Sequence, residues 1–357
     1  MSKDLTNYIE KKDYKKYIII IMIFILIGLI ITTTILIIIN DIIDKVNNSS
    51  AIISTSVSKT NYEYDINESL KVLKIPSSSS NHHITYDNKY SVYFKDNDIQ
   101  IMNISNNDNK YTNISDKNEI IYFDLAYKSN KVIYLTKESN SFGNKIILKI
   151  YDIASKTIKE YNKLIIDNFS NILNLEFNLD KGYVYINIEN KTLTSINNIM
   201  YKLNLNDLRN EIISEKLINK ILLLKNSNDI YYSDIENNIY DKNNDIVDIF
   251  NVKVEIIGSD KDDNIYYLDK TNNSKIFKVN NNIVIEEIML TDSDLTSYYS
   301  DKNKVYLIYP TYVMDISSNN KYERIFKLSS DLSFISIINN VIYLKSNNGN
   351  ILFKEIK

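Results

Sequence analysis

Cysteine and tryptophan are absent from this sequence, and histidine, proline and glycine are scarce, with 2, 2 and 5 copies among 357 residues. Without cysteine the chain forms no disulfides, cysteine-ligated zinc sites or iron–sulfur clusters, and it performs no thiol catalysis. No glycine-rich loop is present to cradle a phosphate, so nucleotide binding has no support. The formal net charge of -3 argues against a broad basic surface, and therefore against nucleic acid as a partner.

The abundant residues favour strands and turns. Tyrosine occurs 29 times, and isoleucine is also frequent. These residues fit the pleated surface of a sheet, whereas the many Asn, Asp, Ser and Lys residues suit the turns between strands. The composition therefore predicts an all-β protein.

One long apolar segment, residues 17–39, lies near the N-terminus and is broken only by Gly28 and Thr32–Thr34. About 20 helical residues, at about 1.5 Å each, cross about 30 Å of hydrocarbon. A cleaved signal peptide is the rival interpretation, but its apolar region would be about 7–15 residues long and would end at a small-residue cleavage site. The stretch Ile35–Ile39 offers no such site. We therefore expect an uncleaved transmembrane helix at 17–39.

The flanking charges predict the orientation of this helix. Four lysines precede it, namely Lys11, Lys12, Lys15 and Lys16. Asp41, Asp44 and a single lysine, Lys45, follow it. Excess lysine marks the cytoplasmic side. We expect residues 1–16 to form a cytoplasmic tail, 17–39 to anchor the chain in the cytoplasmic membrane, and 40–69 to form an extracytoplasmic spacer. The C-terminal domain then lies outside a single-pass anchor.

A repeat occupies the rest of the chain. Its template is Asn264–Asp269 followed by Lys275–Val279, two short strands joined by a polar turn. A tyrosine marks the corresponding strand in each unit, at Tyr93, Tyr134, Tyr185, Tyr232, Tyr267, Tyr306 and Tyr343. These tyrosines lie about 42 residues apart on average, and a period of about 40–50 residues is typical of one propeller blade.

The composition of each unit also favours a blade. Each tyrosine strand has apolar runs before and after it and a more polar run at the end, which gives four strands per unit. The tyrosine strands are apolar on both faces, as expected for a sheet packed between two neighbours. We predict a seven-bladed β-propeller over residues 70–357, with six or eight blades as alternatives.

The two ends of this region predict how the ring closes. The seventh unit stops after Ile351–Lys354 and lacks an outer strand. Residues 70–75 (Leu-Lys-Val-Leu-Lys-Ile) precede the first blade and have a partly polar character. We expect 70–75 to close the last blade, which would remove the exposed edges of an open ring.

The blade template, Ile265–Tyr267 followed by Ile276–Val279, resembles bacterial membrane-anchored propellers related to the YWTD propellers of low-density-lipoprotein receptors. The resemblance covers about residues 85–357. The Trp-Thr-Asp portion of the motif and most blade glycines are missing, so no ligand-binding residue is carried over. The resemblance implies a propeller fold and an extracytoplasmic binding role.

Candidate metal and catalytic residues are few. His82 and His83 are adjacent, and neighbouring side chains of a strand point to opposite faces, so solvated loop residues are favoured over a metal site. A Ser-His-Asp triad would have to use one of them, and no G-x-S-x-G elbow is present. Asp260–Asn264 begins like a calcium loop, but Ile265 replaces the required glycine and the closing glutamate is missing. Turn chemistry is favoured there, and Thr291–Asp294 has the same ambiguity.

Two further features leave alternatives open. A pair of carboxylates for glycoside chemistry cannot be chosen among so many acidic loop residues. Tyr298–Tyr299 and Tyr309–Tyr312 are either packing between blades, which is favoured, or the lining of a carbohydrate or peptide groove.

Together these observations predict a non-catalytic binding or scaffold propeller that recognises a protein or a cell-envelope polysaccharide. No catalytic, cofactor-binding or metal-ligating residue is assigned, and the binding residues stay open. The alternatives are a cell-wall carbohydrate-active enzyme with carboxylates at the channel mouth, and a purely structural assembly protein.

Overall fold

The computed structural model describes residues 22–23, 28, 32–34, 53–56, 63–65, 70–73, 80–104, 111–126, 128–140, 143–166, 169–191, 194–271, 273–290, 293–301, 303–317 and 325–355. The chain forms two compact units, Met1–Ile53 and Ser54–Lys357.

In the first unit, Met22, Ile23, Gly28 and Thr32–Thr34 are helical. The hydroxyl of Thr32 donates to the carbonyl of Gly28 at 2.9 Å, as threonine commonly does inside apolar helices. Among the residues that the structure describes, no helix has the length and apolar character needed to cross a membrane. The predicted tail at 1–16 and nearly all of the predicted anchor at 17–39 lie outside the described residues.

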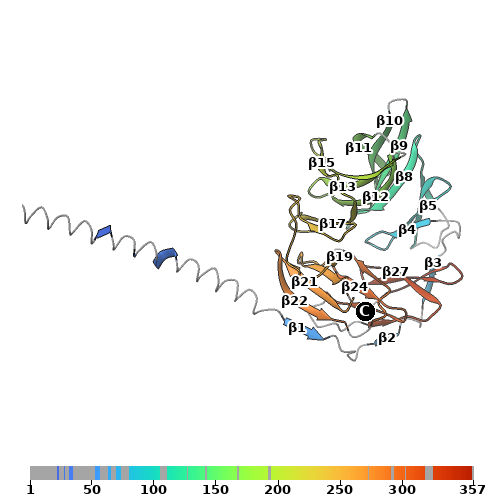
Figure 1. Ribbon diagram of the computed structural model, residues 1–357. Coiled ribbons are helices and arrows are strands. Elements are labelled where there is room, and N and C mark those ends of the chain that lie inside the picture. Colours follow the sequence, from blue (N-terminus) through green and yellow to red (C-terminus); the bar gives the residue numbers. More distant parts are fainter. Residues whose placement is uncertain are drawn as a thin grey trace, which may run out of the picture. The chain divides into compact units, whose positions relative to one another are not determined.

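The second unit is a seven-bladed β-propeller with seven successive sheets (Figure 1). Blade 1 contains β4 (Ser80–Ile84), β5 (Tyr90–Lys95), β6 (Asp98–Asn103) and β7 (Tyr111–Ile114). Blade 2 contains β8 (Glu119–Leu125), β9 (Lys131–Asn140), β10 (Gly143–Asp152) and β11 (Thr157–Ile166). Blade 3 contains β12 (Phe169–Asn178), β13 (Tyr183–Lys191), β14 (Ile196–Asn204) and β15 (Asn210–Ser214). Blade 4 contains β16 (Ile218–Leu223), β17 (Ile230–Asp234) and β18 (Ile239–Tyr240).

The last three blades each include a strand from the N-terminal side of the chain. Blade 5 contains β19 (Val254–Ser259), β20 (Ile265–Asp269), β21 (Lys275–Asn280) and β22 (Ile283–Met289), with β1 (Ile53–Ser56) beside β22. Blade 6 contains β23 (Ser297–Ser300), β24 (Val305–Ile308), β25 (Tyr312–Asp315) and β26 (Ile325–Lys327), with β2 (Glu63–Asp65) parallel to β26. Blade 7 contains β27 (Leu332–Ile338), β28 (Val341–Ser346) and β29 (Ile351–Glu355), with β3 (Lys71–Leu73) beside β29.

The blade that joins the two ends of the ring is built from both ends of the repeat region. Strand β3 pairs antiparallel with β29, and Leu73 lies opposite Ile351. Leu73 is buried in the cluster between blades 7 and 1, which also contains Ile84 and Tyr343. Residues within 70–75 therefore supply the missing outer strand. Strands β1 and β2 lie within the predicted spacer, so part of that segment pairs with the propeller (Figure 1).

The core is divided into seven apolar clusters, one at each junction between consecutive blades. This arrangement explains why the tyrosine strands are apolar on both faces. Tyr266 belongs to the cluster between blades 5 and 6, whereas the next residue, Tyr267, belongs to the cluster between blades 4 and 5. The marker tyrosines of all seven blades are at most 4 % exposed.

Asparagine and aspartate replace glycine in the tight turns. Each of three two-residue hairpin loops places both of its residues at positive φ, namely Asp96–Asn97, Asn281–Asn282 and Asn339–Asn340. Paired left-handed residues match the twist of the flanking strands, and Asn and Asp tolerate that conformation better than other non-glycine residues. A chain with only 5 glycines therefore still forms the many hairpins of a propeller.

Candidate functional site

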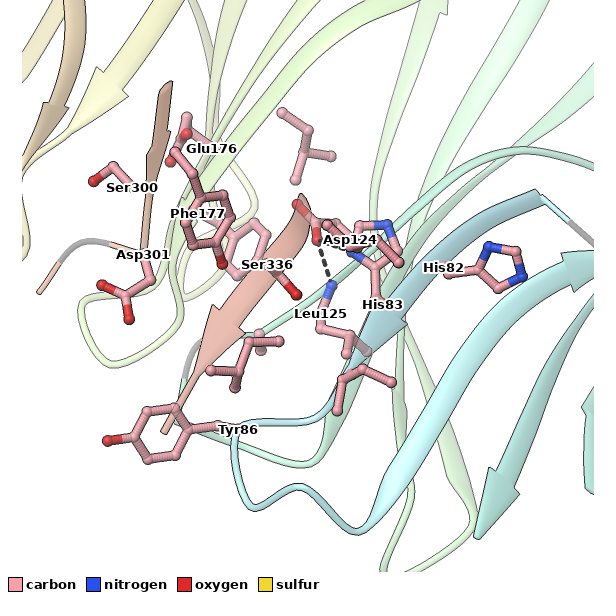
Figure 2. A pocket seen from close by; sticks show the side chains of 16 residues that line it. His82, His83, Tyr86, Asp124, Leu125, Glu176, Phe177, Ser300, Asp301 and Ser336 are labelled. Carbon is pink, nitrogen blue, oxygen red and sulfur yellow. Dashed lines mark hydrogen bonds and ion pairs between the residues drawn. The ribbon is translucent and has the colours of Figure 1, made fainter. Parts of the chain in front are cut away.

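A cavity of about 390 Å³ lies at the centre of the ring, lined by five of the seven blades (Figure 2). Its walls come from the final residues of the innermost strands β4, β8, β12, β23 and β27 and from the turns that follow them. A cavity of this size falls within the range of about 300–1,000 Å³ that is typical of small-molecule sites. The fold therefore provides one concave site to which many blades contribute.

Local backbone irregularities occur in most of the innermost strands, next to several polar side chains. Among the described strands, the pairing of the innermost strand with the second strand shifts register in blades 1, 2, 3, 4, 5 and 7. A bulge bends its strand and re-aims the side chains that follow. His83, Lys220 and Ser336 each stand directly after such a shift. His83 and Ser336 thus reach the cavity beside such irregularities, whereas the innermost pair of blade 6, which supplies Asp301, keeps its register.

The two histidines lie in β4, half-buried, and both line the cavity. The interpretation of His82 and His83 as solvated loop residues is therefore wrong. His83 Nδ1 lies 3.4 Å from Asp124 Oδ1, and the His83 ring packs edge-on against Phe123 at 5.1 Å. His82 contacts the ring of Tyr93 instead, at 5.9 Å. Burial, with a smaller contribution from Lys345, lowers the pKa of His82.

Three carboxylates from different blades line the cavity, namely Asp124, Glu176 and Asp301 (Figure 2). Burial raises the pKa of Asp301, although the backbone N–H groups of Asn303 and Lys304 donate to its Oδ1 at 2.9 and 2.8 Å and oppose that shift. No lysine or arginine occurs among the described residues of this lining. The described charged residues of this lining, apart from the two histidines, are therefore all acidic. Within the described chain, no group of three His, Asp or Glu side chains is placed to hold a metal ion.

A polar network involves the innermost strands of blades 4, 5 and 6. Lys220 of β16 lies over the Tyr298 ring, 4.3 Å from its centre, and donates to the carbonyl of Ile257 at 3.4 Å. Burial lowers the pKa of Lys220 to about 8, and the charges of Glu255 and Glu176 oppose this shift. The Tyr298 hydroxyl donates to Glu255. Tyr298 is thus held next to the partly buried Lys220 side chain.

The other tyrosines for which a groove was the alternative to packing are divided between two roles. Tyr299 lines the cavity and packs edge-on against Phe334 at 5.5 Å. Tyr309 and Tyr312 stack on each other at 4.3 Å inside the cluster between blades 5 and 6. Their role is packing, which the sequence favoured.

A second recess of about 210 Å³ adjoins the cavity. Its lining includes Lys128, Lys131 and Lys225, with Asp180 as the one acidic residue among the described lining residues. Lys225 Nζ donates to Asn303 Oδ1 at 2.7 Å. Burial, followed by the charge of Lys128, lowers the pKa of Lys225.

The candidate calcium loop is a turn held by its own side chains. Asp260 Oδ1 accepts the backbone N–H groups of Asp262 and Asn264, both at 3.0 Å, and Oδ2 accepts the hydroxyl of Tyr266 at 3.0 Å. The Asn264 amide also donates to this carboxylate, and Asp260 is only 2 % exposed. Asp260 therefore fixes the turn, as turn chemistry predicts. In the other ambiguous stretch, residues 291 and 292 lie outside the described residues.

Comparison with known proteins supports the fold. No protein-family model matches the chain, and no curated protein matches its sequence. The tricorn protease is similar in structure, with a TM-score of 0.55 and 11% identity, over 80% of this chain and 34% of that chain. The β-propeller domain of Cps50 (Swd1) from Myceliophteria thermophila has a TM-score of 0.52 and 9% identity, over 81% and 99%. A prolyl endopeptidase has a TM-score of 0.51 and 13% identity, over 78% and 50%.

These likenesses show a β-propeller fold and nothing about activity, because the identities are so low. The chain spans about a third of the tricorn protease chain and half of the prolyl endopeptidase chain. The resemblance to YWTD propellers in particular stays a prediction.

Proposed function

We propose that this protein is a non-catalytic binding propeller, anchored through residues 17–39 and presented outside the cytoplasmic membrane. It recognises a protein or a cell-envelope polysaccharide at the central cavity. The observation that carries the proposal is the 390 Å³ cavity lined by five blades. Such convergent sites, partly apolar with a few placed polar groups, are the usual ligand sites of proteins.

The orientation is tested by adding protease to intact and to permeabilised cells. The excess of lysine before residue 17 predicts that the propeller is digested in intact cells and leaves a membrane-retained stub. Protection of the propeller until the cells are permeabilised would contradict an outward-facing domain.

Binding is tested by thermal unfolding of the full-length protein in detergent with separate envelope fractions of protein, polysaccharide and peptidoglycan digest. A ligand that binds only the folded state raises Tm, by an amount that grows with the logarithm of its concentration relative to Kd. We expect a fraction of protein or polysaccharide to raise Tm. A Tm that no fraction changes would contradict the proposal.

One observation favours the carbohydrate-active alternative. Asp124, Glu176 and Asp301 share one cavity. Burial raises the pKa of Asp301, and a raised carboxyl pKa is typical of general acids. That alternative predicts cleavage of an envelope polysaccharide by the wild type and loss of the cleavage in Asp301→Asn. The binding proposal predicts that the ligand is recovered intact.

A further inference from the structure

The central cavity and the adjoining recess have opposite charge and share a wall. Ala126 and Phe177 line both of them. The described lining of the cavity contains three carboxylates and no lysine or arginine, whereas that of the recess contains three lysines and one aspartate. Two cavities of this kind together favour a ligand with separated positive and negative ends over a simple cation, an anion or a neutral sugar.

Two contacts show that the charged regions border each other. The Lys128 ammonium group lies 5.8 Å from the centre of the Tyr86 ring, and Tyr86 lines the cavity. Lys225, from the recess, donates to Asn303, which in turn donates its backbone N–H to Asp301 of the cavity. A ligand whose positive end lies near Asp301 therefore has lysine ammonium groups close by for its negative end.

We propose that the site binds a short peptide with free ends, an assignment that rests on the proposed binding function. The peptide's ammonium group lies among Asp124, Glu176 and Asp301, and its terminal carboxylate lies against Lys128, Lys131 and Lys225. Charge-assisted hydrogen bonds of both signs are stronger than neutral ones. Phe177 supplies the apolar surface between the two ends.

The test compares three probes by titration calorimetry with the full-length protein in detergent. They are the dipeptide Ala-Ala, its N-acetyl derivative and its C-terminal amide. Each blocked probe lacks one terminal charge, so we expect each to bind at least about tenfold more weakly than the free dipeptide, about 1.4 kcal/mol.

Two variants test which residues bind the amino end and which bind the carboxyl end of the peptide. Asp301→Asn keeps the acceptor for the turn and removes a charge, so it should reduce the discrimination against the acetylated probe only. Lys128 has a φ of 57, which asparagine tolerates, so Lys128→Asn should reduce the discrimination against the amide only. The matched controls are Asp152→Asn, at the end of β10, and Lys156→Asn, in the exposed turn that follows it. They should leave all three affinities unchanged.

Equal binding of free and blocked dipeptides, or no binding of Ala-Ala at millimolar concentration, would overturn the proposal. If blocking the amino end weakens binding and blocking the carboxyl end does not, the site binds a simple cation. That result would also overturn the proposal. If a polysaccharide fraction still raises Tm while Ala-Ala does not bind, the peptide assignment fails and the proposed binding function survives.

Discussion

At the scale of single residues, adjacent tyrosines in one strand have different roles. The Tyr266 hydroxyl donates to the buried carboxylate of Asp260. The hydroxyl of Tyr267 is buried and has no hydrogen-bond partner among the described residues. The repeat marks Tyr267 as the core position of its strand, but only the structure shows that Tyr266 also fixes the preceding turn.

This difference predicts unequal effects of removing the two hydroxyls. Tyr266→Phe should lower the free energy of unfolding by about 1–3 kcal/mol, because a buried carboxylate loses a donor. Tyr267→Phe removes a hydroxyl that is already unsatisfied, so it should be neutral or stabilising. Urea unfolding of both variants measures the difference, and equal losses would show that the Asp260 contact is not stabilising.

The buried carboxyl of Asp301 predicts a pH-dependent effect on stability. Because its pKa is raised in the folded state, the folded protein holds this proton more tightly, and stability falls as pH rises from the ordinary aspartate pKa through the raised one. Asp301→Asn should therefore be stabilising at pH 7, and its advantage should disappear when the pH is lowered below about 3.9, the ordinary pKa.

Asp152 serves as a control, because its pKa is shifted in the opposite direction to that of Asp301. The backbone N–H of Ser155 holds the pKa of Asp152 below its ordinary value. Its stabilising effect is present at neutral pH and is lost as the pH falls through the lowered pKa. Asp152→Asn should therefore be destabilising at pH 7. Urea unfolding at several pH values measures both variants, and effects of the same sign at pH 7 would refute the assignments.

At the scale of elements, two innermost strands approach closely at Gly258. A Cβ added there would lie 2.3 Å from the Cβ of Ser300 in the next blade, and the Ser300 hydroxyl donates to the carbonyl of Ser259 at 3.1 Å. Glycine is needed at this position because there is no space for a side chain.

We expect Gly258→Ala to cost about 1–3 kcal/mol through overpacking. The double variant with Ser300→Gly removes the clashing atom and should recover part of that loss, whereas Ser300→Ala keeps the Cβ and should not. A double-mutant cycle measured by urea unfolding gives the coupling. Simple additivity of the two substitutions would contradict the proposed contact.

The closing strand allows a test with neighbouring residues. Leu73 is 5 % exposed and packs between blades 7 and 1, whereas Val72 on the same strand is 57 % exposed. Leu73→Ala should cost about 2–5 kcal/mol, and Val72→Ala no more than about 0.5 kcal/mol. Thermal unfolding of both variants is the measurement. Equal, small effects would show that β3 does not close the ring.

At the scale of the whole molecule, the sequence predicts the repeat and the blade number because packing between blades imposes a regular pattern. Tyr134 and Tyr267 are recognisable for that reason. The site is not recognisable, because Asp124, Glu176 and Asp301 look like ordinary acidic loop residues in a chain with 45 acidic residues. Their convergence depends on three different blades facing one cavity, which leaves no pattern in the sequence.

The sequence indicates a strand over residues 61–66, but the pairing of the short outer strands β1 and β2 with blades 5 and 6 was beyond sequence analysis. β1 and β2 span only 4 and 3 residues, and they are held by backbone pairing at the edges of blades 5 and 6 rather than by an apolar repeat. Such pairing depends little on side chains, so periodicity does not reveal it.

The central claim, that the ligand binds in the cavity, is tested most directly by protection of an introduced thiol. Because the chain has no cysteine, Ser336→Cys places one thiol in the cavity lining, and Ser155→Cys places one in an exposed turn of blade 2 as control. A small thiol reagent is applied with and without the envelope fraction that raises Tm. We predict slower labelling at position 336 and unchanged labelling at position 155. Unchanged labelling at 336 while the fraction still raises Tm would place the ligand elsewhere and contradict the account.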